Sequence, residues 1–239
     1  MRLRIALPRI PLIEDLTNAP IPSGTNILVE FDPASQWFNA SLTIAAGWVK
    51  TGGSVSYVTL SQSPEDIRSH LSSSGLPVEE LEGNDRLWIY DLYSASTGRK
   101  SKEKYFPESL KVADMSLSVA RDSIAELPSP DFMVINDNGS ILDRFNDERN
   151  WVEFYLTRPF AMGKSRHLNQ LMGFMSGVHS SWAYKQLEAA VDGIVDVKIE
   201  EQAGEIKNLM RIRSMRGVGY DSRWYGLRIG DKFEVILEK

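Results

Sequence analysis

The residues best placed for phosphate chemistry lie in the turn after the first predicted strand, which reads Phe31-Asp32-Pro33-Ala34-Ser35-Gln36-Trp37-Phe38. In α/β proteins this turn cradles phosphate when it carries the pattern G-x-x-x-x-G-K-[ST]. Here Phe31 and Gln36 stand at the two glycine positions, Trp37 at the lysine position and Phe38 at the Ser/Thr position. The turn therefore lacks every diagnostic residue of the pattern.

Each replacement removes a specific contact to a triphosphate. Glycine permits the positive φ that lets successive N–H groups converge on an anion, and a Cβ at either position makes that conformation costly. The lysine neutralises phosphate and the hydroxyl holds magnesium, whereas Trp37 and Phe38 supply neither. Asp32 adds a negative charge, and Ser35 lies between the two altered glycine positions. We expect no cofactor, no catalytic residue and no metal ligand here, with weak ATP binding as the alternative.

Trp37 and Phe38 allow three interpretations. They form a plug that fills the vacated pocket, they form a docking surface for a partner, or they pack in the core as most aromatic side chains do.

Composition sets the class of protein. The chain has 239 residues, 42% of them hydrophobic, a net charge of -5 and no cysteine, which predicts one cytoplasmic domain without disulfides or thiolate sites. No apolar run approaches the roughly 20 residues that span a bilayer. The three histidines, His70, His167 and His179, are scattered and predict no metal cluster. His179 follows a predicted strand and is interpreted as a loop histidine.

The elements that must position the turn alternate between strand and helix. Four short runs read as buried strands: Asn26 to Glu30, Ser54 to Leu60, Arg86 to Asp91 and Phe132 to Asn136. Helical patterns cover Phe38 to Lys50 and the stretch opened by Ser63-Pro64-Glu65-Asp66. Such alternation predicts a mostly parallel sheet with helices on both faces. After Gly193 the runs Ile194 to Ile199, Ile206 to Ile212, Trp224 to Ile229 and Lys232 to Leu237 predict consecutive antiparallel strands.

Five segments, in order along the chain, resemble the KaiC-like and RadA-paralogue branch of the RecA superfamily, which includes the archaellum motor regulator. They are Gly24 to Glu30, Thr51 to Leu60, Leu87 to Asp91, Leu187 to Ile194 and Arg213-Ser214-Met215-Arg216-Gly217. The resemblance implies a RecA-like three-layer sandwich in a single domain, 1–239. Within it we expect an N-terminal extension over 1–20, an α/β core over 21–192 and C-terminal strands over 193–239.

The chain departs from the family pattern at its catalytic positions. Asn136 stands where the family has its magnesium-side aspartate, and Asp137 is one place late, which turns its side chain to the other face of the strand. After the second strand, Leu60-Ser61-Gln62-Ser63 offers neutral side chains where the family has an acidic base. In the last segment Ser214 replaces lysine, while Arg216 remains. Phosphoryl transfer depends on these groups for electrostatic positioning, so we expect a pseudo-ATPase.

Three functions follow as hypotheses. The first is a non-catalytic regulatory or scaffold subunit that binds an active paralogue or a second copy of itself in an oligomer. The second is a nucleic-acid-binding accessory factor in recombination or repair that uses the basic segment over 207–228. The third is weak nucleotide binding without hydrolysis. Arg213 and Arg216 are the interface or trans-acting candidates, and a solvated face of alternating arginines is the alternative for both.

Overall fold

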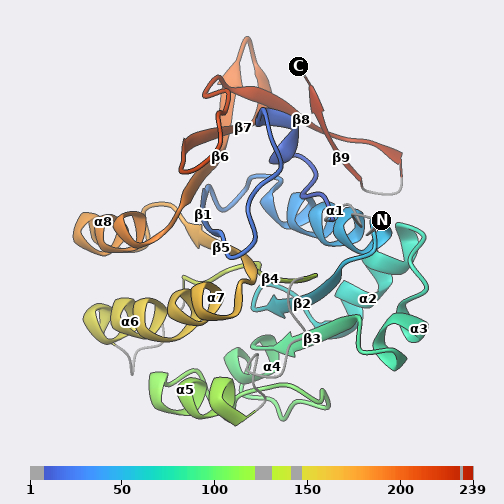
Figure 1. Ribbon diagram of the computed structural model, residues 1–239, viewed down its shortest axis with the longest axis vertical. Helices are drawn as coiled ribbons and strands as arrows, with labels where there is room; N and C mark the ends of the chain where they lie inside the picture. The colour runs from blue at the N-terminus through green and yellow to red at the C-terminus, as the bar shows by residue number, and fades with distance from the viewer. Residues whose placement is uncertain (1–7, 122–130, 141–146, 232–233, 239) are drawn as a thin grey trace, which may run out of the picture.

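A computed structural model describes residues 8–121, 131–140, 147–231 and 234–238 of the chain. Across these residues runs a nine-stranded sheet with the order β3-β2-β4-β5-β1-β6-β7-β8-β9 (Figure 1). The pairs from β3 to β6 are parallel, and β6, β7, β8 and β9 pair antiparallel. The α/β fold with antiparallel strands at its C-terminal end is therefore confirmed.

The strands are β1 Asn26–Phe31, β2 Ser54–Thr59, β3 Leu87–Asp91, β4 Phe132–Asn136, β5 Asn169–Met175, β6 Gly193–Gln202, β7 Glu205–Met215, β8 Tyr225–Ile229 and β9 Val235–Glu238. The helices are η1 Glu14–Leu16, α1 Trp37–Lys50, α2 Pro64–Ser73, α3 Val78–Gly83, α4 Tyr93–Ser96, α5 Val112–Arg121, α6 Glu148–Tyr155, η3 Leu156–Phe160, α7 Ala161–Arg166 and α8 Ser181–Ala190.

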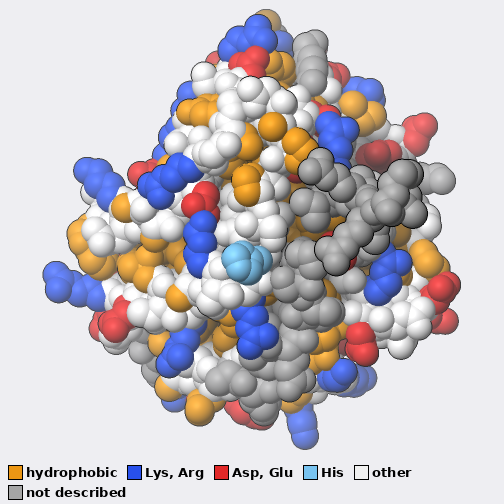
Figure 2. Space-filling model, viewed as in Figure 1, with side chains coloured by type: hydrophobic (Ala, Val, Ile, Leu, Met, Phe, Trp, Pro, Cys, Tyr) orange, Lys and Arg blue, Asp and Glu red, His pale blue; other side chains and the backbone are white. Residues whose placement is uncertain are grey.

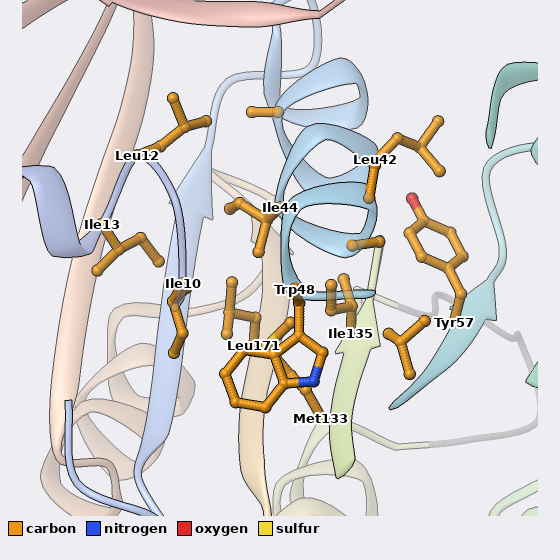
Figure 3. Close-up of a cluster of buried hydrophobic side chains, with 14 of the residues drawn as sticks. Ile10, Leu12, Ile13, Leu42, Ile44, Trp48, Tyr57, Met133, Ile135 and Leu171 are labelled. Atoms are coloured by element: carbon orange, nitrogen blue, oxygen red, sulfur yellow. The ribbon is translucent and has the colours of Figure 1, made fainter. Parts of the chain in front are cut away.

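Two hydrophobic clusters hold the three layers together. On one face, α1, α2, α3 and the segment around Ile10 and Ile13 pack against the sheet. Figure 3 shows Trp48 of α1 lying among Ile44, Met133 and Leu171 in this cluster. On the other face, α5, α6 and α8 pack over the sheet, and their buried side chains include Met115, Trp151 and Leu187. The parallel strands are buried on both faces because helices cover each of them, which is why they read as continuous apolar runs.

The local signals at α2 act as the sequence predicts. The Ser63 hydroxyl accepts a hydrogen bond from the Asp66 amide at 3.2 Å, and Pro64 takes the first helical position, where a missing N–H costs nothing. α1 begins at Trp37, one residue earlier than its apolar periodicity predicts.

The remaining strand predictions hold apart from their ends. β5 is the strand expected before His179, although the sequence pattern did not define its bounds. β9 begins at Val235, and residues 232–233 of the strand predicted there lie outside the described residues. The segment from Tyr93 to Tyr105, whose Ser-Thr-Gly-Arg-Lys-Ser-Lys composition predicts a surface loop, begins with the single turn α4 and ends where Tyr105 stacks on Trp88 with ring centroids 4.6 Å apart.

Candidate functional site

The turn between β1 and α1 is fastened to β6 by Asp32. The Asp32 amide donates to the Val197 carbonyl at 2.9 Å, and the Asp32 carboxylate accepts from the Ile199 amide at 3.1 Å. The Ser35 amide closes the turn by donating to the Asp32 carbonyl at 2.9 Å. These bonds direct the only acidic side chain of the turn into the sheet edge. The Asp32 and Ser35 amides and the Asp32 carboxylate are thus all hydrogen-bonded within the protein.

Trp37, at the lysine position of the phosphate-binding pattern, is buried with 3% of its surface exposed. Its indole Nε1 donates to the Asp137 carbonyl at 2.7 Å, and its ring centroid lies 6.2 Å from that of Phe31. A Cβ added to Gly173 of β5 would come within 2.5 Å of both the indole nitrogen and that carbonyl. The indole therefore fills the space between the start of α1 and the ends of β4 and β5.

The backbone amide of Gln36, which caps the start of α1, also finds a partner inside the chain. The Gln36 amide donates to the Asn208 side-chain carbonyl of β7 at 3.0 Å, and the Gln36 side chain accepts from the Asn39 amide group at 2.7 Å. Phe38 is partly buried and meets the His70 ring edge-on, with centroids 6.1 Å apart. The Ser35 hydroxyl is buried without a hydrogen-bond partner in the described part of the chain.

Asn136, the last residue of β4, and Asp137, which follows it, have different hydrogen-bond partners. The Asn136 amide nitrogen donates to the Tyr155 hydroxyl at 3.1 Å, on the face covered by α6. The Asp137 carboxylate accepts from the Leu60 amide at 2.9 Å and from the Ser61 amide at 3.1 Å, at the end of β2. Burial raises the pKa of Asp137 from 3.8 to about 6 despite these hydrogen bonds, because a buried carboxylate loses its hydration.

Arg213 lies on β7 and Arg216 directly follows that strand, and the two differ in their surroundings. Arg213 of β7 forms ion pairs with the carboxylates of Asp196, Glu188 and Glu30, the last at 2.9 Å. Burial raises the pKa of Glu30 to about 7, although the guanidinium of Arg213 lowers it. Arg216 is exposed, and its guanidinium makes one long contact of 3.4 Å to the Ala189 carbonyl. The structure does not bring these arginines to Trp37.

Asp91 and His179 both have partners within the chain. Asp91 ends a buried strand at the ligand edge of the sheet, where the sequence favours a turn cap over a polar site role, and it accepts from the Ser94 amide at 2.9 Å and from the Ser101 hydroxyl at 2.6 Å. His179 lies in the segment between β5 and α8, with 4% of its side chain exposed and its Nδ1 at 3.5 Å from Glu148. Its Nε2 has no hydrogen-bond partner among the described residues.

Sequence reasoning missed Asn208, which caps the turn from a position 172 residues away. It also missed Glu30, whose carboxylate lies inside β1. A charged residue in an otherwise apolar strand was the signal that could have identified it. In the described parts of the chain, no group of His, Asp or Glu side chains is placed to hold a metal, and no helix is long and apolar enough to cross a membrane.

Comparison with known proteins gives consistent matches over almost the whole chain. Residues 10–239 match the family described as ATPase: KaiC. UPF0273 protein PH0284 of Pyrococcus horikoshii is 24% identical, covering 95% of this chain and 91% of its own. A UPF0273 protein of Thermotoga maritima is 23% identical, covering 95% and 93%.

Two solved structures share the fold. The KaiC-like protein PH0186 of Pyrococcus horikoshii superposes with a TM-score of 0.74 and 17% identity, covering 100% of both chains. The flagellar accessory protein FlaH of Methanocaldococcus jannaschii has a TM-score of 0.71 and 13% identity, covering 98% of this chain and 99% of its own. The family match over residues 10–239 shows that the chain belongs to the KaiC family of ATPases, in the RecA superfamily, and the shared fold agrees with it.

Proposed function

We propose that this KaiC-family protein does not hydrolyse ATP and acts as a regulatory or scaffold subunit that binds other proteins. One observation carries the proposal. Trp37 occupies the sequence position of the phosphate-binding lysine, and its indole is buried and hydrogen-bonded to the carbonyl that follows β4. An indole brings no positive charge to a triphosphate, and moving it out would expose a large apolar surface and break a buried hydrogen bond.

The rest of the turn also fits a triphosphate with magnesium poorly. A phosphate-binding loop offers free amides at a helix N-terminus. Here the Gln36 amide is taken by Asn208, and the Asp32 carboxylate would repel an anion. Neither Trp37 nor Phe38 has an oxygen that could hold magnesium. We therefore propose that the protein has no nucleotide cofactor.

The groups that would support hydrolysis are likewise altered. Asn136 carries no charge for magnesium, and its amide is used by Tyr155. The Asp137 carboxylate already accepts two backbone amides at the end of β2, so binding a metal would require breaking them. The segment at 60–63 offers no carboxylate to take a proton from water.

The protein-binding part of the proposal draws on the fold and its relatives. RecA-type domains are scaffolds on which function is set by local sites, so loss of the nucleotide site leaves surfaces for association. The similar structure from Methanocaldococcus jannaschii is named as an accessory protein. A supporting role of this kind suits a chain that keeps the fold without the phosphate-binding residues.

Nucleic-acid binding is less well supported, because four of the five arginines in the segment 207–228 form ion pairs within the chain, Arg216 being the exception among the described ion pairs. The ion pairs are Arg211 with Asp196, Arg213 with Asp196, Glu30 and Glu188, Arg223 with Asp221, and Arg228 with Glu238. A cation already paired with a carboxylate gains little from a phosphate. Binding to single- or double-stranded DNA that weakens steeply with salt would favour this alternative.

ATP turnover tests the proposal directly. Purified protein with Mg-ATP should release phosphate no faster than a mock preparation from cells that lack the gene. Turnover above that background, lost in Asp137→Asn or Asp91→Asn, would contradict the proposal. Equal turnover in the wild type and both variants would identify a contaminating ATPase instead.

A further inference from the structure

The β6–β7 hairpin projects beyond the sheet at the edge that carries the degenerate turn. Figure 1 shows the two strands extending together at the top of the molecule. They pair up to Gln202 and Glu205, and residues 201–207 are all exposed. An isolated two-stranded ribbon is only marginally stable in water, so this one must be held at its base.

The base of the hairpin is held by the turn that would otherwise bind phosphate. Asp32 accepts from the Ile199 amide on β6, and Asn208 on β7 accepts from the Gln36 amide at the start of α1. Each arm of the hairpin is thus joined to one end of the turn. The side chains that close the turn to an anion are the same ones that orient the hairpin.

The end of the hairpin carries an exposed apolar side chain among charged ones, of which the acids outnumber the bases. Ile206 is 71% exposed and pairs with Glu201 across the hairpin, and residues 198–207 also include Glu200, Glu205, Lys198 and Lys207, with Lys207 opposite Glu200. Lys198 pairs with Glu200 at 2.8 Å, while Glu201 and Glu205 form no ion pair with any described residue. Figure 2 shows charged and hydrophobic atoms together at this end of the molecule. An exposed large aliphatic side chain on a projecting ribbon suits insertion into a pocket of another protein.

We propose that the β6–β7 hairpin is a docking arm, and that it inserts Ile206 into an apolar pocket of a partner protein whose rim carries lysine and arginine side chains. Glu201 and Glu205 favour such a basic rim by charge complementarity, and the same attraction increases the rate of association with the partner. A second copy of this chain is disfavoured, because each copy has a net charge of -5 and the hairpin end, with three glutamates and two lysines, is itself net negative. Asp32 and Asn208 act as positioning residues.

This inference rests on the proposed protein-binding role, yet the two proposals fail separately. ATP turnover would overturn the non-catalytic role and leave the hairpin untouched, whereas the experiments below do not involve nucleotide.

Photo-crosslinking can identify the partner. The chain has no cysteine, so Ile206→Cys places a single benzophenone-maleimide at the tip. Leu117→Cys on α5 is the matched control, because Leu117 is 70% exposed and lies on another element. After irradiation in extract of the cells that make the protein, we expect one protein to be linked through position 206 and not through 117, at a peptide that lines an apolar pocket with basic residues.

Binding of that purified protein then decides the inference. Ile206→Asp and the double charge reversal Glu201→Lys/Glu205→Lys should each weaken binding at least tenfold, and wild-type affinity should fall as salt rises. Leu117→Asp should leave the affinity unchanged. These tip side chains are exposed, so the variants should keep the wild-type thermal midpoint. Equal labelling from 206 and 117, linkage to nucleic acid or to a second copy, or unchanged affinity in the tip variants would overturn the inference.

The positioning role has its own readout. Asn208→Ala should speed hydrogen exchange of the amides in 199–208 at least tenfold and weaken partner binding. Asn208→Asp should restore both, because a carboxylate oxygen can accept the same bond from the Gln36 amide. Failure of Asn208→Asp to rescue exchange would show that the Gln36 bond does not hold the hairpin.

Discussion

Truncation of Trp37 tests whether its indole is part of the core. The side chain is 3% exposed and donates a hydrogen bond to the Asp137 carbonyl at 2.7 Å. Removing a buried tryptophan to the Cβ costs about 3–5 kcal/mol of unfolding free energy, because packing is lost and a cavity remains. Trp37→Phe keeps a six-membered ring but removes the five-membered ring with its N–H donor, and leaving the carbonyl unpaired should by itself cost about 1–3 kcal/mol.

Urea unfolding followed by circular dichroism measures both costs. Trp182→Ala is the matched control, because Trp182 is 42% exposed on α8 and should cost less than about 1 kcal/mol. The expected order of destabilisation is Trp37→Ala, then Trp37→Phe, then Trp182→Ala. If Trp37→Ala cost no more than Trp182→Ala, the indole would not fill the space beside β4, and the argument for a closed site would fail.

Three further predictions concern named positions. Gly173→Ala should cost several kcal/mol in the same assay, because its Cβ would lie 2.5 Å from the Asp137 carbonyl oxygen and the Trp37 indole nitrogen, and an undiminished stability would contradict that packing. The folded protein binds more protons than the unfolded chain between pH 4 and 6, because burial raises the pKa of Asp137 from 3.8 to about 6. Asp137 should therefore lower the stability by about 2–3 kcal/mol over that interval as pH rises, and Asp137→Asn should remove this contribution and leave that of Glu30, whose pKa burial raises to about 7. Ala203→Asn should stabilise by about 0.5–1 kcal/mol, because residue 203 has φ 54° in the hairpin turn, where asparagine is favoured over alanine, and a loss of stability would show that the alanine is unstrained.

The fold was largely predictable because its strands are local features. The runs ending at Phe31, Thr59 and Asn136 are β-branched or aromatic and separated by helical patterns, which predicts a parallel sheet without tertiary information. β5 was harder to delimit, because Asn169-Gln170 at its start and Gly173 inside it weaken the apolar signal of a buried strand.

For the candidate site, the sequence predicts only which phosphate-binding residues are missing. Missing glycines and a missing lysine can be counted in the turn itself, but the groups that replace a phosphate come from distant positions. Asn208 reaches Gln36 across 172 residues, and Trp37 meets Asp137 across 100. The basic segment around Arg213 shows the same limit, because its balancing carboxylates come from Glu30, Glu188 and Asp196 on three other elements. Periodicity and spacing predict which side of a helix or strand is buried, but they do not predict which distant residues contact it.

The thermal midpoint of unfolding with and without millimolar Mg-ATP tests the central claim most directly. A ligand that binds only the folded state stabilises it by RT ln(1 + [L]/Kd) and so raises the midpoint. A turn closed by Trp37, Asp32 and Asn208 should give the same midpoint with Mg-ATP as with Mg²⁺ alone. A rise of several degrees with Mg-ATP, absent with Mg²⁺, would show that the protein still holds nucleotide and would contradict the account.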